Sequence, residues 1–477
     1  MANSNQHFCK DYLVLKPEQA SIFDLVRILY SSDIEKRGFI ECIEPGNLRA
    51  FRRRWLLFVS VLAQKLLLYL EKPMSWTGYI VEMWLNLLSS NGGLGMLLLN
   101  LLKGSAAKPE RSSAAFRSII AAIDTRLALD GSISNSDNRY GASLSMMAAK
   151  LSYENEAFVE AIVEHRWKMQ FLGFFNFWND YEEKASTTAI LFKDNTSNLM
   201  VVAFRGTEPF NADQWRTNVD FSWYELQGAG KIHGGFMKAL GLQRRTGWPK
   251  EIGAPSGTPP FAYYTLREKL RDLTREDEGA KFIVTGHSLG GALAILFGAV
   301  LVLHEEAELL ERLEGVYTFG QPRVGNEQFG EFMKEKLRLH DVKYMRYVYS
   351  NDVVPRLPYD DKTLLFKHFG PCLYFNSRYK GTVLEEEPNK NYFSLLLAIP
   401  KSLNAAWELM RSFIIPYIKG PEYKESWALR LLRVVGLVMP GLSAHFPQDY
   451  VNATRLGSFS WQVDRQDAAP QQGYKCD

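Results

Sequence analysis

Hydrophobic runs divide the chain into three regions. Residues 1–130 contain an unusual block in which almost every position from Trp55 to Leu70 is apolar. Between residues 131 and 460, short runs of β-branched and aromatic residues alternate with helical patterns, which is typical of an α/β domain. Residues 461–477 are polar, and we expect a frayed tail there. The pattern therefore predicts an apolar helical region followed by one α/β domain.

The apolar block, residues 49–102, predicts helices that lie on a lipid surface. Trp55–Leu70 carries only a narrow polar stripe, which includes Ser60 and Gln64. Its 16 residues span about 24 Å as a helix, which is short for a bilayer core of about 30 Å. Two more apolar segments follow, Trp76–Leu88 and Leu94–Leu102, with a Ser-Ser-Asn-Gly-Gly break between them.

Arginines at positions 49, 52, 53 and 54 open this block, directly before its apolar run from Trp55. A basic cluster beside apolar helices suits a lipid surface with anionic headgroups. The alternative is a set of buried helices that cover the α/β domain.

Within the α/β domain, apolar runs predict strands, and longer periodic segments predict helices. The expected strands are Thr187–Phe192, Leu199–Phe204, Phe282–Thr285, Gly315–Phe319 and Lys343–Tyr349, of which the first two form a hairpin. The expected helices are Ser143–Glu164, Phe261–Leu273 and Ala292–Leu303.

Composition excludes few classes of protein. The chain has 477 residues, 46% hydrophobic and 23% charged, which is ordinary for one large globular domain or two. A net charge of +3 gives no indication of a nucleic-acid partner. Cys9, Cys42, Cys372 and Cys476 lack metal-ligand spacing, and they fit a reducing compartment better than a disulfide framework. The first twenty residues lack the basic start and apolar stretch of a signal peptide.

The segment Gly286–Gly290 predicts a catalytic nucleophile. Its sequence, Gly-His-Ser-Leu-Gly, fits the nucleophile elbow G-x-S-x-G, with a β-run before it and an apolar helix after it. The glycines allow a turn too tight for side chains, and the helix N-terminus favours negative charge beside Ser288. A Gly-rich turn that carries a serine by chance is the alternative.

Ser288 requires a base within hydrogen-bond reach and an acid that orients the base. Asp352 is the candidate acid, because it lies on the loop after the β-run that ends at Tyr349. Asp360 and Asp361 are rivals on spacing alone.

Two histidines, His368 and His445, follow Asp352, and spacing cannot choose between them as the base. His233 precedes the serine and is expected in the core or behind the site, while His287 is expected to point elsewhere on the turn.

An oxyanion formed beside the serine needs backbone donors that already face it. The N–H of Leu289, directly after the nucleophile, is one expected donor. Thr207 is the other, because the β-run Val201–Phe204 ends in Arg-Gly-Thr and Thr207 offers both an N–H and a hydroxyl. The alternative is an ordinary turn at Gly206.

Five motifs in one order make the chain resemble the class 3, or fungal-type, lipase family over residues 187–456. They are Phe204–Thr207, Ile232–Phe236, Thr285–Gly291, Tyr317–Asn326 and Asn351–Pro358. The resemblance implies an α/β-hydrolase-like, mostly parallel sheet flanked by helices. It also implies that Ser288 is the nucleophile, Asp352 the acid and His445 the base, with Tyr450 beyond the base.

The resemblance further implies a lid after the Arg-Gly-Thr turn, at Glu208–Tyr224. Phe210, Trp215 and Phe221 alternate there with polar residues, so the segment can cover an apolar site in water and turn its apolar side to lipid. A mixed surface loop is the alternative.

Two departures from the simple family pattern look like the plant oil-body lipases. One is the N-terminal apolar block, and the other is a helical insertion at about 390–440 that contains Tyr392–Ile418 and Trp427–Met439. In those lipases the N-terminal block is taken as the droplet-binding element, and a droplet carries one phospholipid monolayer.

The resulting hypothesis is a triacylglycerol lipase on the cytosolic face of lipid droplets, with the endoplasmic reticulum membrane as a second possible location. We expect acylglycerol substrates, no metal and no organic cofactor, and the apolar helices could mediate a homo-oligomer. A phospholipase of A type and a non-catalytic droplet coat or tether are the alternatives.

Overall fold

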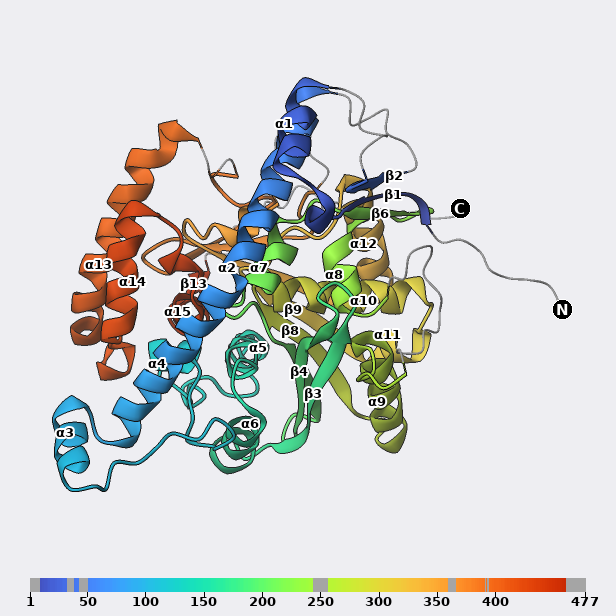
Figure 1. The fold of residues 1–477 in the computed structure, drawn as a ribbon. Helices are drawn as coiled ribbons and strands as arrows, with labels where there is room; N and C mark the ends of the chain where they lie inside the picture. The colour runs from blue at the N-terminus through green and yellow to red at the C-terminus, as the bar shows by residue number, and fades with distance from the viewer. Residues whose placement is uncertain are drawn as a thin grey trace, which may run out of the picture.

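A mixed β-sheet forms the centre of the molecule (Figure 1). The computed structural model describes residues 9–31, 38–42, 50–242, 256–358, 366–390, 392 and 394–459. Among these residues the sheet has nine strands in the order β13-β12-β11-β10-β9-β8-β5-β4-β3. Their bounds are β3 Gln170–Asn179, β4 Lys184–Asp194, β5 Leu199–Phe204, β8 Lys281–His287, β9 Leu313–Phe319, β10 Lys343–Tyr349, β11 Cys372–Phe375, β12 Lys380–Leu384 and β13 Ser458–Phe459.

The middle of this sheet is parallel and its margins are partly antiparallel. Strands β5, β8, β9, β10 and β11 run parallel to one another, whereas β4 pairs antiparallel with β5 and β3, and β12 pairs antiparallel with β11. All five strand predictions are confirmed, including the hairpin of β4 and β5. The fold is therefore the α/β-hydrolase-like arrangement that the motifs imply.

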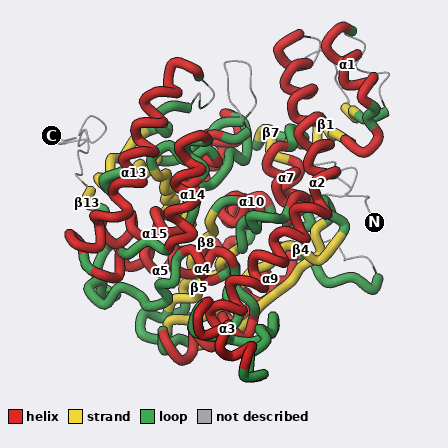
Figure 2. The backbone as a smooth tube through the Cα atoms, turned by 60° about the vertical axis from the view of Figure 1, so that its left-hand side comes forward, coloured by secondary structure: helices red, strands yellow, loops and turns green. Residues whose placement is uncertain are grey.

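Helices cover both faces of the sheet (Figures 1 and 2). One face packs against α8 Gly234–Ala239, α9 Ala262–Glu276, α10 Leu289–Leu303, α11 Ala307–Arg312 and α12 Glu327–Leu339. The other packs against α5 Tyr140–Leu151, α6 Glu156–Ala161 and α15 Pro447–Leu456. The helix predicted over Ser143–Glu164 is divided, because Asn155 accepts a hydrogen bond from the Phe158 N–H and starts α6 there.

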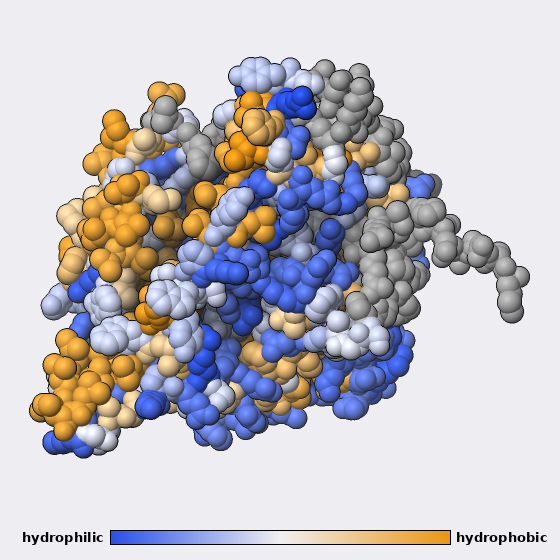
Figure 3. Space-filling view, in the orientation of Figure 1, coloured by the Kyte–Doolittle hydropathy of each residue, from blue (hydrophilic) through white to orange (hydrophobic). Residues whose placement is uncertain are grey.

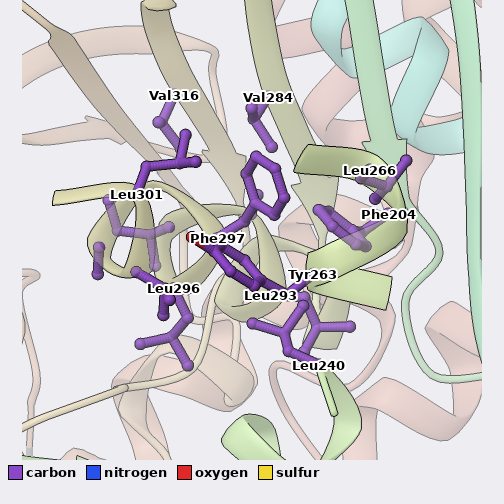
Figure 4. Close-up of a cluster of buried hydrophobic side chains, with 14 of the residues drawn as sticks. Phe204, Leu240, Tyr263, Leu266, Val284, Leu293, Leu296, Phe297, Leu301 and Val316 are labelled. Atoms are coloured by element: carbon purple, nitrogen blue, oxygen red, sulfur yellow. The ribbon is translucent and has the colours of Figure 1, made fainter. Parts of the chain in front are cut away.

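Strand β8 shows why the sheet is buried on both faces. Phe282 and Val284 point into one core and Ile283 into the other, as alternate residues of a strand must. Figure 4 shows Val284 in the first core beside Phe204, Phe297 and Val316. A helix that is apolar all round, such as α10, is stable only in such a position.

The N-terminal region contains strands as well as helices. Strand β1 (Cys9–Leu15) pairs with β2 (Ile40–Cys42) and with β6 (Trp223–Leu226), and β7 (Gly230–His233) completes a second sheet. Two short helices of this region are α1 Ile22–Tyr30 and α4 Ile119–Ile123. The sequence predicted helices alone in the first 130 residues and did not predict β1 and β2.

The apolar block forms one long helix and one short helix. Helix α2 spans Phe51–Ser90, so the division into Trp55–Leu70 and Trp76–Leu88 was wrong. Pro73 lies inside α2 and removes a single backbone donor, a loss that the long helix tolerates. Helix α3 covers Leu94–Leu102 as predicted. Among the described residues no single helix qualifies as a membrane span, but α2 and α3 together do by length and composition, with a bend of 79°.

The polar stripe of α2 faces the protein. Ser60 Oγ donates to the Val219 carbonyl at 2.7 Å, at the end of helix α7 (Ala212–Val219). Gln64 accepts from the Tyr181 hydroxyl at 3.1 Å and donates to an Asp220 carboxylate oxygen at 3.4 Å. Large apolar residues on other sides of α2 are exposed, among them Trp55, Leu62, Leu66 and Tyr69.

The insertion predicted at about 390–440 forms a helical hairpin. Helix α13 (Ala398–Lys419) and helix α14 (Trp427–Val438) pack against each other, beside the segment that leads into α15. The polar tail predicted at 461–477 lies outside the described residues.

Candidate active site

Ser288 occupies the sharp turn between β8 and α10. Its backbone has φ 59° and ψ −129°, a conformation that L-residues rarely adopt, and its N–H donates to the Phe319 carbonyl at 2.9 Å. The glycines on either side are required by space. A Cβ on Gly286 would lie 2.1 Å from the Gly290 carbonyl carbon, and one on Gly290 would lie 2.2 Å from the Phe204 carbonyl oxygen. The turn thus holds Ser288 at the carboxyl end of the parallel strands.

Ser288, His445 and Asp352 form a continuous chain of hydrogen bonds. His445 Nε2 lies 2.8 Å from Ser288 Oγ, and His445 Nδ1 lies 2.9 and 2.8 Å from the two carboxylate oxygens of Asp352. Because a carboxylate only accepts, Nδ1 carries the hydrogen, and Nε2 is free to accept from the serine hydroxyl. These residues come from three loops that the sheet brings together.

The carboxylate of Asp352 is held from two further directions. Its Oδ1 accepts from the Val354 N–H at 2.9 Å, and its Oδ2 accepts from the Tyr450 hydroxyl at 2.5 Å. Asp352 is fully buried. The sequence placed Tyr450 beyond the base but gave it no contact with the acid.

The backbone of His445 is held by His287. His287 Nε2 donates to the His445 carbonyl at 2.7 Å, so His287 Nδ1 accepts from the Tyr153 hydroxyl at 2.9 Å. Burial lowers the pKa of His287 well below its ordinary value, so the ring is neutral. The expectation that His287 points elsewhere was incomplete, and no sequence signal indicated Tyr153.

The remaining candidate histidines lie away from Ser288. His368 Nε2 donates to the Pro355 carbonyl at 2.7 Å, and His233 Nε2 donates to the Asp220 carbonyl at 2.8 Å. Burial lowers the pKa of each to about 3. Asp360 and Asp361 lie outside the described residues.

The expected oxyanion donors flank the serine. Leu289 is the first residue of α10. Thr207 follows Gly206, where an added Cβ would lie 3.1 Å from Ser288 Cβ. The Thr207 hydroxyl accepts from the Asn218 side-chain amide at 3.1 Å, so the threonine is joined to α7.

The segment predicted as a lid lies under α2. An added Cβ on Gly78 of α2 would lie 2.7 Å from Phe210 Cβ, and a cavity of about 550 Å³ is lined by residues of α2 and by Glu208–Asp213. The Trp215 indole N–H donates to the Pro209 carbonyl at 3.1 Å, and the ring of Phe221 lies 6.4 Å from that of Phe366. Ser288 is 1% exposed, so this conformation is closed to a bulky substrate.

The elbow, the hydrogen-bonded serine, histidine and aspartate, and the α/β sheet together define a serine hydrolase of the α/β-hydrolase type. Comparison with known proteins gives the family. A family model described as Lipase (class 3) matches residues 201–362.

Relatives align with almost the whole chain. A triacylglycerol lipase OBL1 from Nicotiana tabacum is 46% identical, with 85% of this chain and 83% of the relative covered. Its counterpart from Arabidopsis thaliana is 42% identical, with 96% of each covered. The one from Ricinus communis is 37% identical, with 94% and 95% covered. The chain belongs to the class 3 lipase family.

Proposed function

We propose that the chain is a triacylglycerol lipase that works at the surface of lipid droplets. The observation that carries the proposal is the hydrogen-bonded sequence Ser288–His445–Asp352. The relatives' printed name, triacylglycerol lipase OBL1, supports the substrate class. The exposed apolar residues of α2 support work at a lipid surface.

In the proposed reaction Ser288 Oγ attacks the ester carbonyl carbon while His445 Nε2 takes the hydroxyl proton. Asp352 keeps the imidazole in the required tautomer and stabilises its charged form. The N–H groups of Leu289 and Thr207 hold the oxyanion, each contributing on the order of 3 kcal/mol of transition-state stabilisation. His445 then protonates the departing diacylglycerol oxygen. Water attacks the carbonyl carbon of the acyl-serine while His445 takes its proton, and His445 returns that proton to Ser288 Oγ as the fatty acid leaves. The residues need no metal or organic cofactor for this chemistry.

Access to Ser288 requires the proposed lid, Glu208–Tyr224, to move. Ser288 is closed off, and α7 is joined to α2 through Ser60 and Gln64. We propose that lipid contact shifts α2 and α7 together, which exposes the apolar sides of Phe210, Trp215 and Phe221 to substrate.

We place the protein on the cytosolic side of the droplet monolayer. Helix α2 turns its polar stripe inward and apolar side chains outward, as an interfacial helix does. Imaging in cells distinguishes this location from the endoplasmic reticulum membrane.

The test compares Ser288→Ala with Ser145→Ala on emulsified triacylglycerol. Ser145 is another buried serine, whose hydroxyl has no hydrogen-bond partner among the described residues. We expect Ser288→Ala to lose ester hydrolysis by a factor of about 10⁴ or more while it still binds droplets, and Ser145→Ala to keep both activities.

The alternatives give different results in the same assays. Faster release of fatty acid from phosphatidylcholine than from triacylglycerol identifies a phospholipase. Full activity of Ser288→Ala would show that Ser288 is not the nucleophile. An unmodified protein that binds droplets but never labels with a fluorophosphonate is a coat or tether.

A further inference from the structure

Helices α13 and α14 turn charged residues inward and apolar residues outward. In these two fully described helices, Lys401, Glu408, Arg411 and Arg433 are buried, and Arg430 is half-buried. The exposed residues are mostly large and apolar, including Ile399, Leu403, Phe413, Tyr417, Trp427 and Val438. This is the reverse of a helix that faces water.

Three of the inward charges, Glu408, Arg411 and Arg433, form an ion network with Glu425 and Asp449, and Lys401 and Arg430 donate to backbone carbonyls. Arg433 donates to both carboxylate oxygens of Glu425, at 2.6 and 2.7 Å, and to Asp449 at 3.1 Å. Arg411 donates to Asp449 at 2.7 Å. Because these charges are already paired within the protein, the outer face presents almost no polar group except near the turn of the hairpin.

The same face continues beyond the hairpin. Figure 3 shows apolar side chains gathered on one side of the molecule, over α13, α14 and α3. The outward apolar residues of the hairpin and those of α2 and α3 are thus candidates for one common surface.

The turn of the hairpin has the composition of a lipid interface. Tyr417 and Trp427 are 91% and 66% exposed, and between them Lys419 and Lys424 are exposed together with a single acidic residue, Glu422. Amphipathic aromatic rings lie at headgroup level, and lysines pair with anionic headgroups. A fluid lipid surface also adapts to separate convex elements, whereas a second copy of the chain would have to be complementary to all of them.

We propose that the outer face of the α13–α14 hairpin is a second lipid-docking surface, which binds the phospholipid monolayer together with α2 and α3. This proposal rests on the proposed function at the droplet surface and adds a contact to it. The hairpin also touches both catalytic loops. Asn404 donates to Ser350 Oγ at 2.9 Å, and an added Cβ on Gly436 would lie 2.8 Å from Ser443 Oγ. Docking through the hairpin therefore determines how far Asp352 and His445 lie from the lipid monolayer.

The test uses the full chain with Ile399→Glu, Tyr417→Glu and Val438→Glu combined. These side chains are 73%, 91% and 85% exposed, so the substitutions leave the core intact. The matched control is Leu339→Glu on α12, where an apolar side chain is 69% exposed away from the hairpin. Flotation with triolein droplets coated with phosphatidylcholine and phosphatidylserine measures binding. Hydrolysis of a water-soluble short-chain ester measures the integrity of the site.

We expect the triple variant to lose droplet binding by on the order of tenfold or more, because three apolar contacts are replaced by charges that the monolayer repels. Hydrolysis of the soluble ester stays within about twofold of the unmodified chain, and Leu339→Glu binds normally. A serine version at the same three positions gives a smaller loss of binding, which separates a graded surface effect from misfolding.

Equal flotation of the triple variant and the unmodified chain overturns the proposal. It is also overturned if the substitutions convert a dimer into a monomer in sedimentation and leave flotation unchanged, because the face then joins two copies. If the unmodified chain hydrolyses the soluble ester but never floats, the droplet location in the proposed function fails first.

Discussion

Tyr450 links the catalytic acid to the helix that follows the base. Its hydroxyl donates to Asp352 Oδ2 at 2.5 Å and accepts from the Tyr349 N–H at 3.3 Å. Burial raises the pKa of Tyr450 well above its ordinary value, so the hydroxyl keeps its proton and remains a donor. The residue fixes the rotation of the carboxylate that in turn orients His445.

We predict that Tyr450→Phe lowers kcat on a soluble ester by about tenfold with little change in KM. The lost hydrogen bond to a charged group is worth about 1.5–3 kcal/mol, and part of that holds the carboxylate in its catalytic orientation. Tyr344→Phe is the control, because it removes another buried hydroxyl, which donates to the side chain of Gln321 at 2.9 Å and not to the catalytic acid. Equal kcat in both variants would show that Tyr450 only supports the fold.

Residues that end a β-run were predictable, and their partners across the fold were not. Ser288, Asp352 and Thr207 each follow an apolar run, so their placement at one edge of the sheet follows from the pattern. The bond from His287 to the His445 carbonyl joins residues 158 positions apart. Such a contact depends on how three loops pack, and neither motif nor spacing contains that information.

At the scale of elements, α2 shows what hydrophobic periodicity can and cannot determine. The apolar positions and the narrow polar stripe with Ser60 and Gln64 were visible in the sequence. The sequence did not indicate which way the stripe faces, because a helix at a lipid interface and a helix that covers the core have the same pattern. The packed structure turns the stripe toward α7, where buried polar atoms find partners. Two wrong helix predictions have local causes. The N-cap at Asn155 divides the helix that was predicted as one, and α2 continues through Pro73 where two helices were predicted.

We predict that Gln64→Leu lowers the free energy of unfolding by about 1–3 kcal/mol, whereas Leu66→Gln changes it by less than about 0.5 kcal/mol. Gln64 is buried, and its loss leaves the Tyr181 hydroxyl without its acceptor. Leu66 is 57% exposed on the same helix. Chemical denaturation measures both variants, and hydrogen exchange over residues 51–70 localises the effect. The reverse ranking would mean that α2 presents its apolar side to the protein.

Across the whole molecule, buried histidines make the fold sensitive to acid. Burial lowers the pKa of His233 and of His368 to about 3, against about 6.5 in an unfolded chain. Between these values the unfolded state binds a proton that the folded state does not, so stability rises with pH. The stabilising contribution is complete above pH about 6.5 and is lost as the pH falls toward 3. Glu154 acts in the opposite direction, because burial raises its pKa to about 7.

The contributions of the buried histidines and of Glu154 are distinguished by the slope of the unfolding free energy against pH, not by its value at one pH. We predict that the unfolding constant of His368→Gln depends less steeply on pH than that of the unmodified chain. Between pH 6 and 4 the difference is a factor of about ten per pH unit, because one fewer proton is taken up on unfolding. Glutamine keeps a donor for the Pro355 carbonyl, so the fold should persist. Denaturant midpoints and slopes at several pH values give the constant for the variant and for the unmodified chain. Identical pH dependence in the variant and the unmodified chain would mean that His368 is protonated in the folded chain, which its burial and the charges of Arg346 and Arg323 oppose and the charge of Glu387 favours.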